Sequence, residues 1–454
     1  ESAIFQRGRT LAMQKQHQLA IVDFTKVLSI NSESYESFYS RGVSFSRQSK
    51  FYHAVLDFTS AIQINPRSPD LHYNRALAFK KLSEHELAIK DYTKAIELNP
   101  KHFQAFNNRG LTNRDLKRFS EALADFKSCT KANPDFFDGY WNRSLTHLMI
   151  GEYEEAWRLY EYRWKSSGFT SQQRKFNQPL WLGGSDLSNR TLLLHSEQGL
   201  GDTLQFSRYI RKFSNLDCTI FLEVEKPLTS IMECLLPKNQ IIKKGDQLPF
   251  FDYHCPLMSL PLAFKTTKET VPYSSPYLFA LQKRVQWWNQ YLGVKTKQRI
   301  GIAWKGNPKH TNDQNRSIQL ETLITHLTPD CEWFSLQISI SETEQRLIDD
   351  NGNIKHFGKL IGDFAETAAF CSVLDAVICV DTSIVHLAGS IGVPTHLLLA
   401  YVADARWHDK GKHTPWYNNV KIYRQGSDQN WIAPLQAAFS SISNATKHCT
   451  NNRP

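Results

Sequence analysis

A turn in the central part of the chain places glycines and a carboxylate directly after an apolar strand. The run is His195-Ser196-Glu197-Gln198-Gly199-Leu200-Gly201-Asp202-Thr203, and it precedes an amphipathic helix. Glycines at a strand end let a ligand approach the backbone and the N-terminus of the next helix. The run lacks the third glycine of a dinucleotide fingerprint and the lysine of a P-loop. The candidates are Gln198, Gly199, Gly201 and Asp202, and the alternative is a structural turn with Asp202 as an ordinary helix cap.

A second strand ends in side chains suited to a phosphate. It continues as Cys379-Val380-Asp381-Thr382-Ser383-Ile384-Val385-His386, and we place the helix start at 381–383. The hydroxyls of Thr382 and Ser383 and the free backbone N–H groups then point at one spot, which suits an anion. His386 follows one turn later on the same face as Ser383 or Thr382. The alternative is a set of N-cap residues followed by a core histidine.

The third candidate is a basic loop after the strand RIGIAW. It contains Lys305, Asn307, Lys309 and His310, and Arg316 follows downstream. Such a loop fits a diphosphate, and the alternative is a solvated surface loop. No Asp-x-Asp pair occurs in the chain, and its histidines and cysteines lack zinc spacing. We therefore expect no bound metal and no cofactor.

Short apolar runs alternate with helical stretches beyond residue 190, and they predict two parallel α/β lobes. The first lobe takes strands at 191–195, 218–224 and 240–244, and the second takes strands at 299–304, 332–337, 375–380 and 395–400. A helix and a linker within about 281–298 join the lobes. Parallel α/β lobes bind ligands at the carboxyl ends of their strands. The pattern therefore predicts a two-lobed enzyme with its site in the cleft at the strand ends.

The first third of the chain repeats itself at a period of 34 residues. The recurring positions are Gly8, Gly42, Ala76, Gly110 and Ser144; Ala20, Ala54, Ala88, Ala122 and Ala156; Phe24, Phe58, Tyr92, Phe126 and Tyr160; and Pro66, Pro100 and Pro134. Small residues let two helices approach, the aromatic residue fills the space between pairs, and proline stops the second helix. This segment, about 1–165, resembles the tetratricopeptide repeat family, which implies an α-solenoid of about five helix pairs. Almost no residues precede the first helix, which predicts that upstream repeats are missing.

Three polar ladders share this register. They are Arg7, Arg41, Arg75, Arg109 and Arg143; Asp23, Asp57, Asp91 and Asp125; and Asn74, Asn108 and Asn142. We expect each arginine to pair with the aspartate of its own helix pair. Leu159 replaces the fifth aspartate, which predicts that Arg143 is free. The asparagines either face a groove, where their amides bond a peptide acceptor, or are solvated on the helix surface.

The composition is that of an ordinary globular protein. Hydrophobic residues make up 41% and charged residues 22% of the 454 residues. The net charge of +10 suits phosphate-bearing ligands and does not by itself imply nucleic acid. No apolar run approaches the length of a membrane span. Eight cysteines without a C-x-x-C pair favour a reduced, cytoplasmic protein, although the chain begins at Glu1 without a methionine, so a lost targeting segment stays open.

The three motifs together resemble a known enzyme family. EQGLGDTLQFSRY, GIAWKGNPKH with NRSI, FSLQ and VDTSIVHLAGSIGVPTHLLL, in this order, are similar to the bacterial family 9 glycosyltransferases, the heptosyltransferase group. The chain looks most like bacterial proteins that join tetratricopeptide repeats to such a domain. The resemblance implies an N-terminal α-solenoid followed by a GT-B pair of Rossmann-like lobes. The repeats depart from plain heptosyltransferases, so the lipopolysaccharide acceptor of that group does not carry over.

The resemblance also implies roles for the candidate residues. The reaction would be an inverting, metal-independent transfer of a sugar from a nucleotide-sugar donor. Asp202 matches the general base, and Asp381, Thr382 and His386 match the residues that hold the diphosphate. Arg316, with Lys305, would neutralise the leaving nucleotide in place of a metal. Gln337 ends a strand of the donor lobe and would face the base or ribose.

We therefore expect a cytoplasmic glycosyltransferase whose repeats recruit a protein or peptide acceptor, with no nucleic-acid partner. The expected parts are a repeat array at 1–165, a linker or docking strap at 166–190, an acceptor-side lobe at 191–285, a nucleotide-sugar lobe at 286–440 and a tail at 441–454. One alternative is the same enzyme acting on a glycan or lipid-linked acceptor. The other is a non-catalytic repeat scaffold with a nucleotide-binding domain.

Overall fold

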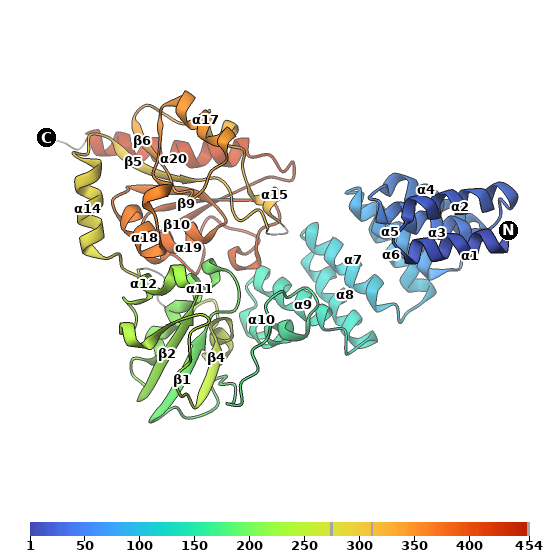
Figure 1. The fold of residues 1–454 in the computed structure, drawn as a ribbon, viewed down its shortest axis with the longest axis horizontal. Helices are drawn as coiled ribbons and strands as arrows, with labels where there is room; N and C mark the ends of the chain where they lie inside the picture. The colour runs from blue at the N-terminus through green and yellow to red at the C-terminus, as the bar shows by residue number, and fades with distance from the viewer. Residues whose placement is uncertain (273–275, 310–311, 452–454) are drawn as a thin grey trace. The chain divides into compact units, whose positions relative to one another are not determined.

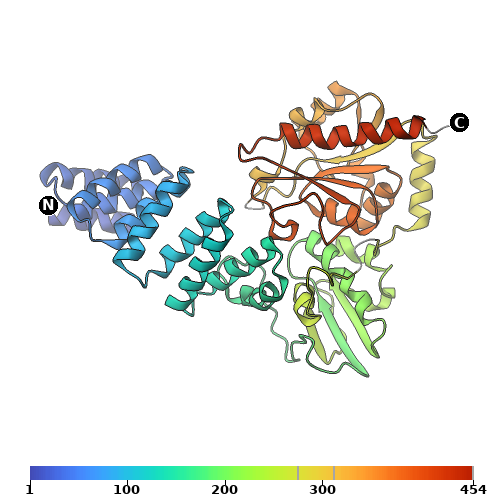
Figure 2. The same cartoon turned by 180° about the vertical axis from the view of Figure 1, so that it is seen from behind.

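Helices fill the first third of the chain, and two parallel sheets with their covering helices fill the rest (Figures 1 and 2). The computed structural model describes residues 1–272, 276–309 and 312–451, with side chains up to residue 443. It divides into two units. Unit 1 comprises Glu1–Ile150 and Leu159–Thr170, and unit 2 comprises Gly151–Arg158 and Ser171–Pro454.

The repeats fold as five helix pairs, as the 34-residue period predicts. The helices are α1 (Ser2–Met13), α2 (His17–Ile30), α3 (Tyr35–Arg47), α4 (Phe51–Ile64), α5 (Pro69–Lys81), α6 (His85–Leu98), α7 (Phe103–Asp115), α8 (Phe119–Ala132), α9 (Phe137–Ile150) and α10 (Tyr153–Tyr160). A Cβ on Gly42 would lie 2.8 Å from the Phe58 ring, so this position must stay small for α3 to approach α4. Gly8 and Gly110 meet Phe24 and Phe126 at the same distance.

The arginine–aspartate ladder ties each pair together, and this prediction is confirmed for four pairs. Arg41 Nε and Nη2 donate to the two carboxylate oxygens of Asp57 at 2.8 and 2.7 Å. The same two-point contact joins Arg7 to Asp23, Arg75 to Asp91 and Arg109 to Asp125. The expectation that Arg143 is free is wrong, because it has a partner other than the missing ladder aspartate.

Each turn between paired helices contains a residue in the left-handed region. These residues are Lys15, Ser49, Ser83, Lys117 and Gly151, with φ between 60° and 83°. Left-handed backbone favours glycine because it has no Cβ to clash with the carbonyl oxygen. The turns therefore carry strain in four repeats and avoid it in the fifth.

Unit 2 contains two parallel sheets, one in each lobe. The first lobe has strand order β3-β2-β1-β4, from β1 (Arg190–His195), β2 (Cys218–Val224), β3 (Ile241–Lys243) and β4 (Tyr253–Pro256). The second has order β10-β9-β8-β5-β6-β7, from β5 (Gln298–Ala303), β6 (Cys331–Ser335), β7 (Ile354–His356), β8 (Ala376–Val380), β9 (Thr395–Leu399) and β10 (Val420–Arg424). The central strands lie where the sequence places them, within two residues.

Helices cover the faces of both sheets. The first lobe contains α11 (Leu200–Phe206), α12 (Thr229–Met232) and α13 (Leu260–Ala263), and α14 (Gln282–Leu292) follows it. The second lobe contains α15 (Asp313–Arg316), α16 (Leu320–Ile324), α17 (Glu342–Asn351), α18 (Phe364–Ser372), α19 (Ser383–Ser390) and α20 (Ile432–Asn451). Figure 1 shows α20 on one side of the six-stranded sheet and α18 and α19 on the other. Leu435 and Phe439 of α20 join strand residues such as Ile378 in one apolar core.

Strands β4, β7 and β10 were not predicted, and all three lie at the edge of a sheet. β4 and β7 are only 4 and 3 residues long. β10 reads VKIYR, in which charged residues interrupt the apolar ones. An edge strand buries less surface than a central one, so its sequence carries a weaker apolar signal.

Candidate functional site

One hollow of about 530 Å³ in unit 2 gathers the three sequence motifs from both lobes. Its lining includes most of the predicted site residues, namely Gly199, Gly201, Asp202, Lys305, Asn307, Arg316, Gln337, Asp381, Thr382, Ser383 and His386. Gln198, which was also predicted as a site residue, does not line this cleft. Asp404 and Arg406 also line it, and sequence reasoning did not select them. The cleft therefore brings together side chains that lie more than 200 residues apart in the chain.

Asp202 caps the helix that carries it. Its Oδ2 accepts a hydrogen bond from Gly199 N at 2.9 Å, which stabilises the first turn of α11. The cap interpretation is therefore correct, and the other carboxylate oxygen is buried 2.7 Å from Arg406 Nη2. Two other polar residues of this turn, His195 and Glu197, are buried away from the cleft. His195 Nε2 lies 3.2 Å from His254 Nδ1, and Glu197 Oε1 accepts from Met258 N at 3.1 Å.

Gly201 lets α11 approach α19. A Cβ at this position would lie 2.8 Å from His386 Cδ2, closer than real side chains come. The glycine thus sets the distance between the first-lobe turn and the helix that begins the second motif. Because α11 and α19 belong to different lobes, any larger residue here would push the two sides of the cleft apart.

The start of α19 forms the phosphate side of the cleft. Thr382 is the N-cap residue, and its Oγ1 accepts from Ile384 N at 3.3 Å. Thr382 and Ser383 are half-buried and line the cleft at the positive end of this eight-residue helix. Backbone N–H groups and hydroxyls at such an end can hold an anion.

Arg406 lies at the centre of a cluster that joins the two lobes. We call Arg406 with Asp202, Gln205, His386 and Asp404 the Arg406 cluster. Arg406 Nε donates to Asp404 Oδ1 at 2.8 Å, and Nη1 donates to Gln205 Oε1 at 2.9 Å. Nη2 forms an ion pair with Asp202 Oδ1 at 2.7 Å. The sequence signal that could have identified Asp404 and Arg406 is the run ADARW, because this run follows the end of β9 just as the other motifs follow strand ends.

His386 is buried and contacts Tyr417 and Arg406. Its Nδ1 lies 2.9 Å from Tyr417 Oη, and its Nε2 lies 3.3 Å from Arg406 Nη1. Burial and the nearby guanidinium of Arg406 hold the pKa of His386 well below its usual range, so the ring is neutral. A neutral ring that accepts from Arg406 at Nε2 must carry its proton on Nδ1. The diphosphate contact that the resemblance implies for His386 stays a prediction, and the buried ring fits the alternative of a core histidine.

Asp381 has an unusual protonation equilibrium. Burial, together with the nearby Asp404 carboxylate, raises the pKa of Asp381 from 3.8 to about 6, and Arg406 opposes this rise. Its backbone oxygen accepts from Arg316 Nη1 at 2.9 Å. Asp381 therefore gains a proton in mildly acidic solution, which would lower the negative charge of the cleft.

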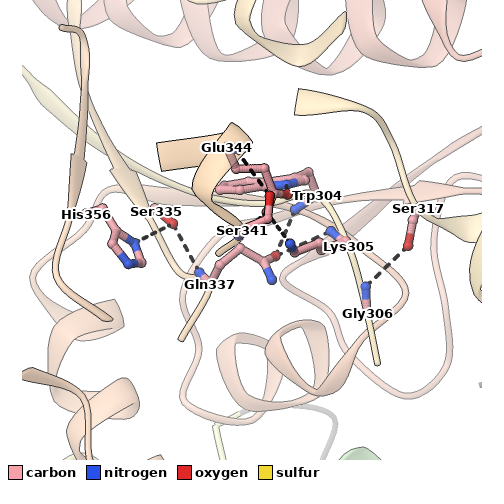
Figure 3. Close-up of polar contacts among 9 residues, drawn as sticks. All are labelled: Trp304, Lys305, Gly306, Ser317, Ser335, Gln337, Ser341, Glu344 and His356. Atoms are coloured by element: carbon pink, nitrogen blue, oxygen red, sulfur yellow. Dashed lines mark hydrogen bonds and ion pairs between the residues drawn. The ribbon is translucent and has the colours of Figure 1, made fainter. Parts of the chain in front are cut away.

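The basic loop is held by a network around Glu344, which Figure 3 shows. Lys305 Nζ pairs with Glu344, and Trp304 Nε1 donates to Glu344 Oε1 at 2.7 Å. Burial disfavours the charged carboxylate, but Lys305 and its other donors outweigh this and lower the pKa of Glu344 to about 2. The charge of Lys305 is thus balanced within the lobe, which reduces its value for neutralising a nucleotide.

Gln337 positions the end of β5. Its Oε1 accepts from Trp304 N at 3.2 Å and from Lys305 N at 3.3 Å, as drawn in Figure 3. Arg316 pairs with Asp313 at 3.1 Å and packs over Gly306, where a Cβ would lie 2.3 Å from its Nη2. His310 lies outside the described residues.

The asparagine ladder lies in unit 1 and is half-buried. Asn108 Nδ2 donates to Tyr73 Oη at 2.9 Å, and Asn142 Nδ2 donates to Asn107 Oδ1 at 3.0 Å. Each of these bonds crosses from one repeat to the preceding one, so the amides are not only solvated surface groups. Asn74 and Asn108 also line a hollow of about 480 Å³.

Comparison with known proteins identifies the repeats. Residues 69–102 and residues 103–136 each match the tetratricopeptide repeat family, so the N-terminal array consists of tetratricopeptide repeats. Protein FlbA of Caulobacter vibrioides is 24% identical over 306 residues, which cover 60% of this chain. The chain spans half the length of that curated relative.

Solved structures of repeat proteins are also similar. The crystal structure of MamA has 19% identity and a TM-score of 0.33, and the match covers 34% of this chain and 91% of MamA. YrrB, described as a repeat protein with an unusual peptide-binding site, has 22% identity and a TM-score of 0.31, with 36% of this chain and 82% of YrrB covered. A repeat protein from Parabacteroides merdae has 22% identity and a TM-score of 0.34, with 36% and 64% covered.

None of the helices described is long and apolar enough to cross a membrane. Within the same residues, no group of three or more His, Cys, Asp or Glu side chains has an arrangement that could hold a metal ion.

Proposed function

We propose that unit 2 is a glycosyltransferase with two GT-B-type lobes, which moves a sugar from a nucleotide-sugar donor to an acceptor hydroxyl. The observation that carries this proposal is the convergence of three separate motifs in one cleft. The motifs resemble those of family 9 glycosyltransferases, and the cleft lies at the carboxyl ends of parallel strands, where α/β proteins bind their ligands.

The donor diphosphate would bind at the start of α19. Thr382 and Ser383 offer hydroxyls there, and Arg316 is anchored on the backbone of Asp381 with its guanidinium facing the cleft. Lys309 is exposed at the cleft and forms no ion pair with any described residue, so it is available to an incoming phosphate. These groups would stabilise the negative charge that develops on the leaving nucleoside diphosphate.

Asp202 would act as the general base. Its Oδ1 would accept the proton of the acceptor hydroxyl while the oxygen attacks the anomeric carbon. The bond between that carbon and the phosphate oxygen breaks, the nucleoside diphosphate leaves with the bonding electrons, and the configuration at the carbon inverts. Of the carboxylates in the β1–α11 turn, Asp202 is the one that lines the cleft, because Glu197 is bonded to Met258 N.

The repeat array would recruit a protein or peptide acceptor. Its hollow is lined by Arg47, Lys80 and Lys81 along with Asn74 and Asn108. Of the three cations, Lys80 pairs with Asp115 at 3.1 Å, whereas Arg47 and Lys81 are exposed. Positive charge at the rim favours an acceptor segment with acidic residues.

A direct experiment is to incubate the purified chain with UDP-, GDP-, CDP- and ADP-linked sugars in the presence of EDTA and to measure nucleotide release. We expect release from one donor class, increased by the correct acceptor and unaffected by the chelator. Release that disappears with EDTA would contradict the metal-free mechanism. Binding of a nucleotide sugar without any nucleotide release would favour the alternative, a non-catalytic repeat scaffold with a nucleotide-binding domain.

A further inference from the structure

The first turn of α10 brings the side chain of Tyr153 against the loop that follows β9. Tyr153 is buried, and its ring stacks on Trp416 near the end of this loop. Its Oη lies 2.9 Å from His408 Nε2, which is hydrogen-bond distance. Tyr153 therefore contacts the loop at two points, one through its ring and one through its hydroxyl.

Both partners of this hydrogen bond are neutral. Burial raises the pKa of Tyr153, so the hydroxyl keeps its proton at neutral pH. Burial, together with the nearby Lys268 and Arg424, lowers the pKa of His408 from 6.5 to about 4, so the ring is uncharged there. A tyrosine hydroxyl can donate or accept, and it can therefore bond Nε2 in either tautomer of the ring.

The backbone at His408 has a conformation that residues with a side chain rarely adopt. Its φ of 59° and ψ of 178° lie in a region populated almost only by glycine. Such a residue keeps its conformation only where its surroundings hold it. The Tyr153 hydroxyl holds the ring, and Arg424 Nη2 donates to the backbone oxygen of Trp407 at 2.7 Å, which fixes the preceding peptide.

This strained residue ends the turn that carries Arg406. The turn, η7 (Ala405–Trp407), follows β9, and His408 is its C-cap residue. From it Arg406 reaches into the cleft, where Nη2 lies 2.7 Å from Asp202 Oδ1. Because the turn is only three residues long, a different backbone conformation at its end would change the direction of the Arg406 side chain.

The same helix also contacts the element on the other side of this ion pair. Trp157, one turn after Tyr153 in α10, packs edge-on against Phe206. Phe206 is the last residue of α11, and the first turn of α11 carries Asp202. α10 therefore contacts both elements whose side chains form the Asp202–Arg406 pair, one from each lobe.

We propose that Tyr153 is a positioning residue of the cleft, which holds turn η7 through His408 and thereby orients Arg406 against Asp202. This inference rests on the proposed function and adds a part of the repeat register to it. Residues Gly151–Arg158 continue that register but belong to unit 2. The last helix of the register thus shapes the site of transfer, although its hydroxyl does not touch the reacting atoms.

The test is Tyr153→Phe, which removes the hydroxyl and keeps the ring on Trp416. The full chain is assayed with the nucleotide sugar from which it releases nucleotide fastest, and binding of the corresponding nucleoside diphosphate is measured by calorimetry. We expect kcat to fall about threefold to tenfold, as loss of one neutral hydrogen bond allows. The affinity for the nucleoside diphosphate should stay the same, because Thr382 and Ser383 at the phosphate side are unaltered.

Tyr423→Phe is the matched control. Tyr423 Oη lies 2.9 Å from His396 Nδ1, and burial lowers the pKa of His396 to about 4. This hydrogen bond has the same kind of partners and the same length, but neither Tyr423 nor His396 lines the cleft. The control should lower the melting temperature about as much as Tyr153→Phe and leave kcat unchanged.

Variants of His408 test the route from the hydroxyl to the turn. His408→Ala loses the ring and keeps the strained backbone, whereas glycine adopts this φ without strain. We therefore expect His408→Ala to lower kcat and His408→Gly to recover part of it. In the His408→Ala background, Tyr153→Phe should cause no further loss.

Two results would overturn the positioning role. The same kcat in Tyr153→Phe and Tyr423→Phe would mean that the Tyr153 hydroxyl only stabilises the fold. A further loss from Tyr153→Phe in the His408→Ala background would mean that the hydroxyl does not act through His408. If the unaltered chain releases nucleotide from no donor, the proposed function itself fails and the positioning role fails with it, which distinguishes that outcome from the first two.

Discussion

Asp202 combines a structural and a chemical task in one side chain. One carboxylate oxygen caps α11 through Gly199 N, and the other faces Arg406 across the cleft. The capping bond orients the side chain, so that the second oxygen lies beside Arg406 Nη2. A helix cap and a general base are therefore compatible interpretations of this residue, and mutation can separate them.

Asp202→Asn should abolish most turnover without unfolding α11. The amide oxygen of asparagine can still accept from Gly199 N, whereas the amide cannot take a proton, and loss of a general base costs about 10²–10⁴-fold in rate. Steady-state kinetics and the melting temperature should be measured on the same preparation. Near-normal kcat would assign Asp202 to the helix cap alone and move the base elsewhere.

Asp381 should make unit 2 less stable as the pH rises from about 4 to about 6. The pKa of Asp381 is raised from 3.8 to about 6 in the folded chain, so the folded state binds a proton that the unfolded state has already lost in this window. Asp381 keeps some contact with solvent, so we expect an effect of about 1 kcal/mol. Asp381→Asn should thus stabilise the protein more at pH 7.5 than at pH 4.5. Urea unfolding curves at the two pH values measure this difference. The same difference at both pH values would argue against a raised pKa.

For single residues, the sequence predicted which side chains line the cleft better than it predicted which of them contact one another. The three motifs were recognisable because each follows the end of an apolar strand. The Arg406 cluster was not, because its members come from α11, α19 and the turn after β9, and nothing in their spacing indicates that they meet. The family resemblance assigned His386 to the diphosphate, and the pattern left a core histidine as the alternative. The packing of Tyr417 and Trp407 against its buried ring fits that alternative.

At the scale of the elements, the turns between paired helices contain positions where glycine should raise the stability of unit 1. Ser49→Gly and Ser83→Gly should each stabilise unit 1 by about 0.5–1 kcal/mol, because glycine relieves the left-handed strain at the cost of some chain entropy. Both serines are exposed, so no contact is lost. The unfolding transition of the array in the full chain would report the change. Gly151→Ser introduces the same strain in the fifth turn and should destabilise unit 2, to which Gly151 belongs.

The hollow in the array should bind acidic peptide through its exposed cations. Reversing two of them, Arg47→Glu with Lys81→Glu, should weaken binding of a labelled peptide rich in serine and glutamate at least about tenfold, since two attractions become repulsions. Fluorescence anisotropy on the full chain measures this. Lys127→Glu with Lys131→Glu changes the charge equally on exposed positions of α8 that do not line the hollow. Equal loss in both double variants would point to net charge rather than to this surface.

The asparagine ladder should be tested with its structural role in mind. Asn108→Ala removes an inter-repeat bond to Tyr73 and should lower stability by about 0.5–1.5 kcal/mol. An acceptor effect of this variant is therefore informative only beside its melting temperature. A stability unchanged by the substitution would mean that the amide is a surface group after all.

The elements were largely readable from the sequence, for physical reasons that differ between the units. The array has a strict repeat, so the same pattern of small and aromatic residues predicts a helix pair at each of the five repeats. In unit 2 the central strands are continuous apolar runs, whereas the edge strand β10 alternates with charges and was missed. The order of the strands within each sheet could not be predicted from the periodicity of the sequence, because strand pairing depends on the crossover connections and not on the local pattern.

At the scale of the whole chain, the sequence places a boundary near residue 165, but the packing divides the chain elsewhere. Residues Gly151–Arg158 belong to unit 2 although they continue the repeat register. Tyr153 and Trp157 are each 3% exposed. Tyr153 stacks on Trp416 with centroids 5.9 Å apart, and Trp157 meets Phe206 edge-on at 6.2 Å.

A shortened chain that begins at Gly151 should therefore fold and bind nucleotide, whereas one that begins at Ser171 should be unstable. The second loses two buried aromatic side chains, each of which is worth about 3–5 kcal/mol. Soluble yield, melting temperature and nucleoside diphosphate binding compare the two. Equal stability of both would mean that the α10 aromatics contribute nothing to unit 2.

This interleaving of the two units has a consequence for how such chains can be recombined. An exchange of arrays between related genes, whether by natural recombination or by design, must carry the codons of Tyr153–Arg158 with the α/β part. The polar stretch at 166–190 has the composition of a linker. A crossover there would nevertheless replace Tyr153 and Trp157 by the residues of another array, and these would not be matched to Trp416. The turn at Gly151 is therefore the position that tolerates an exchange. Diversification of the repeats should accumulate upstream of that glycine, and the seven residues after it should vary together with the α/β part on which they pack.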